Sequence, residues 1–155
     1  MQSAEINDLV AQIRRHELTL AKMYTQFAKS YPKHRQLLSQ LAREEVLHAK
    51  WMKSLAQHYT KGHLGLSDFR LNPQVLRTSI SRLEKQIEES KQGRLSLRNA
   101  VAIALDVEKS MIENKFFEIF DLVEGKRNRI RAGLEKETSK HRQKLEKLFS
   151  ELSQN

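Results

Sequence analysis

The chain has 155 residues, a length that predicts a single domain over residues 1–155 with room for a sizeable core. It has no cysteine, which excludes disulfides, thiolate zinc sites and iron–sulfur clusters, and no run of about 18 apolar residues that could cross a membrane. The formal net charge of +9 favours anionic partners, and the first residues lack the pattern of a signal peptide, so we expect a cytoplasmic protein.

Two helices are predicted at the start of the chain. Apolar residues recur every three or four positions over about 4–30 and again over about 33–59, as they do along the buried face of an α-helix. Pro32 ends the first helix and can stand in the first turn of the second. Because the link between them is short, we expect the two helices to pack antiparallel.

Three further helices are predicted after a loop over about 61–72. An Asn-Pro pair is typical of a helix start, and the amphipathic helix that follows, over about 73–91, is long enough to cross from one end of a bundle to the other. Two longer helices, over about 96–123 and about 127–152, complete the chain. The pattern predicts an all-α protein, an antiparallel four-helix bundle with a helical crossover between its second and third bundle helices.

Polar residues interrupt the apolar stripe of each bundle helix near its midpoint. In an antiparallel bundle the four midpoints meet in one layer, so we expect carboxylates and imidazoles to converge there. Buried carboxylates in one layer would repel one another and take up protons, whereas divalent cations would turn that repulsion into ligation. For each residue alone, a solvent-facing carboxylate or a hydrogen-bonded histidine stays an alternative. The interrupting residues are Glu17, Glu45 with His48, Glu108, and Thr138 with His141.

Two segments resemble the rubrerythrin type of ferritin-like di-iron bundle. Residues 17–28 are similar to the first helix of that family, with Tyr24 seven residues after the glutamate, and residues 96–109 are similar to its third helix. The resemblance covers about residues 5–57 and 95–150. It implies a di-iron centre bridged by one glutamate of the second helix. The ligands would be Glu17 and His48 for one ion, Glu108 and His141 for the other, and Glu45 for both.

One ligand of the family pattern is missing. The fourth helix of the family would place a glutamate three residues before His141, and this chain has Thr138 there, with Glu137 as a candidate substitute. We expect two iron ions. A single ion and an empty site held by hydrogen bonds stay open, and manganese or zinc stays an alternative to iron. Tyr24 is a candidate catalytic residue that would hydrogen-bond a ligand carboxylate; the alternative is an ordinary core tyrosine.

The resemblance implies a metal-dependent oxidoreductase of the peroxidase or ferroxidase type, or a protein that handles iron. Because the chain lacks the cysteine-bound iron domain of full rubrerythrins, its electrons would come from a separate donor. The alternative function is a bundle with a vestigial site, whose basic fourth helix binds an anionic partner. We also expect a homodimer, since Phe116, Phe117 and Phe120 place aromatic residues on more than one side of the third helix.

Overall fold

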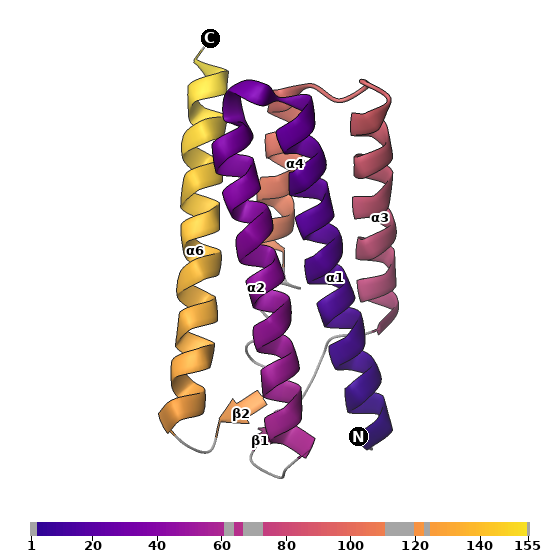
Figure 1. The fold of residues 1–155 in the computed structure, drawn as a ribbon, viewed down its shortest axis with the longest axis vertical. Helices are drawn as coiled ribbons and strands as arrows, with labels where there is room; N and C mark the ends of the chain where they lie inside the picture. The colour runs from indigo at the N-terminus through magenta and orange to yellow at the C-terminus, as the bar shows by residue number, and fades with distance from the viewer. Residues whose placement is uncertain (1–2, 61–63, 67–72, 111–119, 123–124, 155) are drawn as a thin grey trace.

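The structure is a computed structural model that describes residues 3–60, 64–66, 73–110, 120–122 and 125–154. Helices account for most of these residues (Figure 1). The elements in chain order are α1 (Ser3–Ser30), a 3₁₀ turn (Pro32–His34), α2 (Arg35–Thr60), β1 (Leu64–Leu66), α3 (Pro73–Lys91), α4 (Leu97–Lys109), β2 (Phe120–Leu122) and α6 (Gly125–Ser153).

Local chemistry sets the helix ends, and the predicted bounds of α1, α2, α3 and α6 agree closely with those observed. Pro32 opens the 3₁₀ turn that leads into α2, where its missing N–H leaves no bond unmade. Gly93 follows α3 with φ of 69°, a left-handed conformation that suits glycine after a helix. Ser96 caps α4, because its side chain accepts a hydrogen bond from the backbone N–H of Asn99 at 3.2 Å.

The predicted helix over 96–123 is wrong at Ser110 and at Phe120–Leu122, and residues 111–119 of it lie outside the described residues. Helix α4 ends at Lys109, and Ser110 has an extended backbone. Phe120–Leu122 forms strand β2, which pairs antiparallel with β1, Leu122 facing Leu64 and Phe120 facing Leu66. Periodicity did not reveal this ladder, since a short apolar run fits a helix or a strand and the strand's partner lies in a distant segment. The expectation of an all-α protein therefore holds apart from these two short strands.

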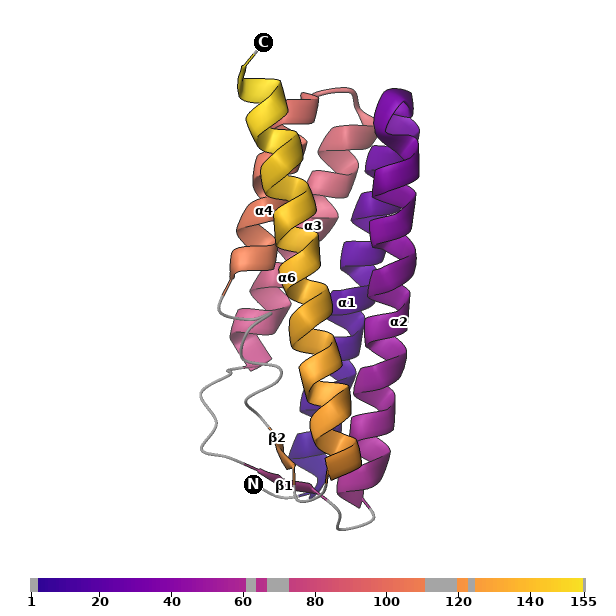
Figure 2. The same ribbon diagram turned by 90° about the vertical axis from the view of Figure 1, so that its left-hand side faces the viewer.

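The long helices lie side by side along one axis (Figures 1 and 2). Helices α1, α3 and α6 run in one direction, and α2 and α4 run in the other (Figure 1). Helix α3 follows α2 and precedes α4 in the sequence, and it returns the chain to the other end of the molecule, as predicted for the crossover. It packs against α1. The buried face of α3 consists of Leu76, Ile80, Leu83 and Ser90.

The hydrophobic core is built mainly by four helices. Leu20, Met23, Tyr24 and Phe27 of α1 pack with residues of the other three, which are Leu38, Leu41 and Ala42 of α2, Ala100, Val101 and Ala104 of α4, and Leu145 and Leu148 of α6. Within the described ranges, no helix has the combination of length and apolar character needed to cross a membrane.

The residues behind the expected homodimer are not covered. Phe116 and Phe117 lie outside the described residues, and the side chain of Phe120 does too. The homodimer stays a prediction.

Candidate metal centre

Five polar side chains from four helices meet in one buried layer. Three of them, Glu45, Glu108 and His141, are 0% exposed, and the other two are almost as deeply buried. The five residues are Glu17 of α1, Glu45 and His48 of α2, Glu108 of α4 and His141 of α6. They are five of the six residues that interrupt the apolar stripes, all except Thr138, and the structure brings them together.

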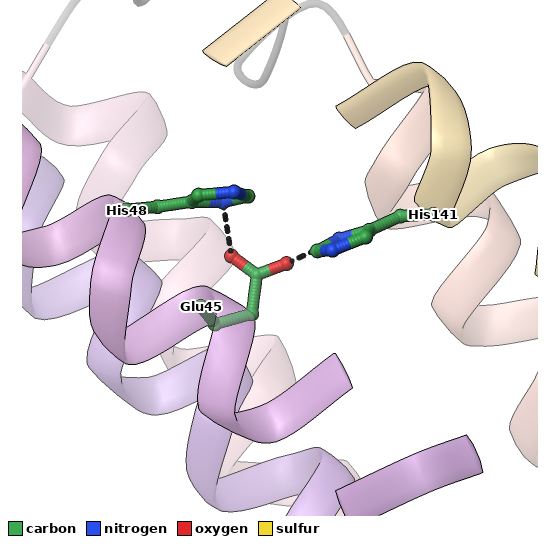
Figure 3. A group of neighbouring side chains, drawn as sticks. All are labelled: Glu45, His48 and His141. Carbon is green, nitrogen blue, oxygen red and sulfur yellow. Dashed lines mark hydrogen bonds and ion pairs between the residues drawn. The ribbon is translucent and has the colours of Figure 1, made fainter. Parts of the chain in front are cut away.

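Glu45 lies between the two histidines (Figure 3). Its Oε2 is 3.1 Å from Nδ1 of His48, and its Oε1 is 2.9 Å from Nδ1 of His141. The two imidazole rings face each other, with centroids 5.2 Å apart. One carboxylate therefore links a histidine of α2 to a histidine of α6, and each histidine uses the same ring nitrogen.

A second carboxylate faces each of these nitrogens. Nδ1 of His48 is 3.6 Å from Oε2 of Glu17, and Nδ1 of His141 is 3.3 Å from Oε1 of Glu108. The arrangement thus has two matching halves, each with one imidazole nitrogen, one oxygen of Glu45 and one oxygen of an outer glutamate.

This donor set fits divalent metal ions. Two ligand atoms bound to one ion at about 2.1 Å each lie about 3.0–3.4 Å apart, close to the separations in both halves. Imidazole nitrogen and carboxylate oxygen suit iron, manganese and zinc. Oε2 of Glu108 and Nε2 of His48 are buried and have no hydrogen-bond partner among the described residues. The buried group Glu45, His48 and His141 could hold a metal ion.

Tyr24 is tied to this layer. It is fully buried, and its hydroxyl donates a hydrogen bond of 2.8 Å to Oε1 of Glu108. Tyr24 is thus both a core residue and a partner of a candidate ligand, so the two interpretations from the sequence describe one side chain. The bond occupies Oε1 from one side and leaves Oε2 open.

Thr138 leaves the α6 half of the centre one carboxylate short. Its side chain is 3% exposed, and Oγ1 has no hydrogen-bond partner within the described part of the chain. Glu137 is partly buried, and its Oε1 accepts a hydrogen bond from Lys140 at 3.4 Å. Glu137 belongs to a second group with Glu44 and His141, not to the group around Glu45.

Glu44 is a residue that the sequence did not single out. Its Oε2 is 2.5 Å from Nε2 of His141, the ring nitrogen that does not face Glu45, and Lys144 lies 3.6 Å from its other oxygen. Metal-binding histidines commonly donate their second N–H to such a carboxylate, which fixes the tautomer and the orientation of the ring. In the sequence Glu44 looks like any charged residue beside an apolar stripe.

His16 is the second residue that sequence reasoning missed. It is fully buried, with Nε2 2.9 Å from Oγ of Ser79 on α3 and Nδ1 3.7 Å from Oε1 of Glu17. Because α1 packs against both α2 and α3, its buried face is wider than a single stripe. A buried polar residue at position 16 could have been found only by knowing that α3 covers this side of α1.

Burial and charge shift the pKa values in the layer. Burial, followed by the negative charges of Glu17 and Glu108, raises the pKa of Glu45 to about 8. Burial alone would lower the pKa of each histidine, but contacts with glutamates outweigh it and raise the pKa of His48 to about 10 and that of His141 to about 11. Without a cation, these raised pKa values favour the protonated forms of Glu45, His48 and His141.

Two other glutamates have lowered pKa values. Burial raises the pKa of Glu17, but hydrogen bonds with His16 and His48 bring it well below its usual range. Burial also raises the pKa of Glu44, but the charge of His141, a hydrogen bond from Gln40 and the charge of Lys144 together lower it below its usual value. Both carboxylates are therefore ready to bind a cation near neutral pH.

No family model, curated protein or solved structure matches this chain.

Proposed function

We propose that this chain is a ferritin-like di-metal carboxylate protein of the rubrerythrin type, which binds iron and acts as a peroxidase- or ferroxidase-type oxidoreductase. The observation that carries the proposal is the place of Glu45, whose two oxygens face Nδ1 of His48 and Nδ1 of His141. A core drawn from α1, α2, α4 and α6, with α3 as the crossover, supports a four-helix bundle of the ferritin-like type.

The residues would share two ions between them. Glu17 and His48 would hold one ion, and Glu108 and His141 would hold the other. Glu45 would contribute one oxygen to each. With Thr138 in place of a carboxylate, the ion near His141 would have fewer protein ligands, so the two ions would bind with different affinities.

Bound iron supplies the change between the ferrous and ferric states through which peroxide or dioxygen can be reduced. The protein's own residues prepare the site for this chemistry. The hydroxyl of Tyr24 donates to Oε1 of Glu108 and so fixes this carboxylate beside Nδ1 of His141, while Oε2 has no hydrogen-bond partner among the described residues. Glu44 holds Nε2 of His141 and keeps Nδ1 directed at the centre. Complete burial of Glu45 and His141 limits water at the site.

The test compares Glu45→Ala with wild type. The variant removes the shared ligand, so we expect iron content to fall to background and peroxide-dependent oxidation of iron(II) to fall by at least about 100-fold. Iron is measured by elemental analysis and oxidation by stopped-flow absorbance. The matched control is Glu151→Ala, which removes an exposed carboxylate of α6 and should change neither. Unchanged iron content in Glu45→Ala would rule out the proposed centre.

A second candidate function is binding of an anionic partner through α6 around a vestigial site. The observation in its favour is that Lys136 and Lys147 are exposed on α6. Lys140 and Lys144, however, pair with Glu137 and Glu44 beside the centre, so part of the basic charge of α6 is already neutralised. Affinity for double-stranded DNA that falls steeply with salt, in a protein that takes up no iron, would favour this candidate.

A further inference from the structure

A groove of about 690 Å³ lies on the outer side of α1 and α2, beside the last turns of α3. Four cations line it, and no carboxylate is found among its described lining residues. The cations are Lys22 and Lys29 of α1, Arg43 of α2 and Lys91 of α3. None of the four is in an ion pair with another described residue, unlike Lys140 and Lys144 of α6. The groove therefore has positive charge that nothing in the described chain neutralises.

One end of the groove is apolar. Leu18 of α1 and Val46 of α2 line this end, and each is 38% exposed. Leu18 follows Glu17 and Val46 follows Glu45, so this end of the groove lies about a quarter turn round each helix from the glutamate that faces the centre.

We propose that this groove docks a small acidic electron-carrier protein, which reduces the metal centre. This inference rests on the proposed function, because a buried redox centre needs a donor. The centre is closed to direct contact, since Glu45 and His141 are fully buried, and the chain has no cysteine with which to hold an iron–sulfur cluster of its own. Weak redox complexes have small interfaces, and a basic groove with an apolar end is complementary in charge to a small acidic protein.

Other occupants fit the groove less well. A second copy of the chain would bring like charges together, because the chain has a net charge of +9. Single-stranded nucleic acid prefers surfaces with aromatic side chains on which bases can stack, and the described residues that line the groove include none.

Each encounter transfers one electron. With iron bound at the centre, the donor's reduced [2Fe–2S] cluster would lose one electron and one ferric ion would gain it. Two such encounters would supply the two electrons needed to reduce two ferric ions. No bond forms or breaks in the donor.

The binding test uses plant-type ferredoxin, an acidic [2Fe–2S] protein, as the probe and the isotopically labelled chain without metal. At low salt we expect amide shifts to concentrate at Leu18, Lys22, Arg43 and Val46. The double variant Lys22→Glu with Arg43→Glu should weaken binding at least about tenfold. The control, Lys136→Glu with Lys147→Glu, makes the same change in net charge on α6 and should weaken it less than about twofold.

The kinetic test follows reduction of the iron-loaded, oxidised protein by reduced ferredoxin in a stopped-flow instrument. The groove variant should be reduced at least about tenfold more slowly, and the slowing should disappear at high salt. Dithionite, a small reductant that needs no docking surface, should reduce wild type and both variants at the same rate. Equal rates for all three proteins with ferredoxin would overturn the docking site.

Two further results of the binding test would overturn the proposal. The first is that both double variants weaken ferredoxin binding equally. The second is that single-stranded DNA or anionic vesicles bind at the same residues more tightly than ferredoxin does. Absence of ferredoxin binding at low salt would overturn it too. The proposed function and the docking site can fail separately. If the chain takes up no iron, the proposed function fails. If ferredoxin still binds at the groove, and only the Lys22→Glu with Arg43→Glu variant weakens that binding, the docking site stands.

Discussion

The two ring nitrogens of His141 face two different kinds of carboxylate. Nδ1 faces Glu45 and Glu108, which are the candidate ligands, and Nε2 faces Glu44, which is partly exposed. If a metal ion binds at Nδ1, the N–H at Nε2 can donate to Glu44, and the ring is then fixed from both sides. Glu44 acts through His141 and is a positioning residue.

Replacing Glu44 should therefore weaken the centre without removing it. We expect Glu44→Gln to lower metal affinity by about 10- to 100-fold while the number of ions bound at saturation stays the same. Competition with a chromophoric chelator measures the affinity. Glu146→Gln changes an exposed carboxylate that pairs with Lys109 and is the matched control. Equal affinities in the two variants would show that Glu44 has no positioning role.

At the scale of single residues, the sequence predicted the residues that interrupt an apolar stripe. Glu17, Glu108 and His141 stood out because an isolated polar side chain on a buried face is unusual. Glu44 did not stand out, since a charged residue at the edge of a helix face is ordinary. Its contact with His141 depends on how closely α2 and α6 approach, which no pattern within one helix reveals.

At the scale of elements, α3 is more than a connection. Its buried residues Leu76, Ile80 and Leu83 pack toward α1, and Ser79 on the same helix contacts His16. Helix α3 therefore covers the side of α1 next to Glu17. We infer that α3 supports the centre from behind as well as crossing the bundle.

Packing of α3 can be tested with a matched pair of variants. Leu83 is 1% exposed and belongs to the core, so Leu83→Ala should lower the free energy of unfolding by about 2–5 kcal/mol. Val75 on the same helix is 48% exposed, and Val75→Ala should change it by less than about 0.5 kcal/mol. Urea unfolding of the metal-free protein measures both. A small loss in Leu83→Ala, similar to that in Val75→Ala, would contradict this role of α3.

The sequence predicted most elements because their ends have local signals. Pro32, Gly93 and Ser96 each act on the backbone within a turn of where they stand. Strand β2 has no such signal, because its hydrogen bonds go to β1, a segment more than fifty residues away along the chain. Pairing between distant segments is the part of this fold that periodicity could not supply.

At the scale of the whole molecule, the charges of the buried layer make stability depend on pH and would couple it to metal binding. Without metal, the pKa values of Glu45, His48 and His141 lie above their usual values. A group with a raised pKa binds its proton more tightly in the folded protein. The stability it adds is present below the unfolded pKa and is lost as the pH rises through the folded one. Metal ions would displace these protons.

We therefore expect the metal-free protein to lose stability as the medium becomes alkaline. The stability that protonated Glu45 contributes is lost between about pH 4.5 and 8. The stability that the two protonated histidines contribute is lost from about pH 6.5 to 10 for His48 and to 11 for His141. The unfolding temperature should fall by at least about 5 °C between pH 6 and pH 10. Circular dichroism measures it, and Glu45→Gln should flatten the curve below pH 8. An unfolding temperature that rises over this range would contradict the assigned protonation.

The most direct test of a two-part centre is to count iron ions in variants that each remove one half. Elemental analysis should find two ions per chain in wild type, about one in His48→Ala, about one in His141→Ala and none in Glu45→Ala. This pattern follows because each histidine serves one half and Glu45 serves both. Fewer than one ion per chain in folded wild type, or the same loss in all three variants, would contradict the shared centre.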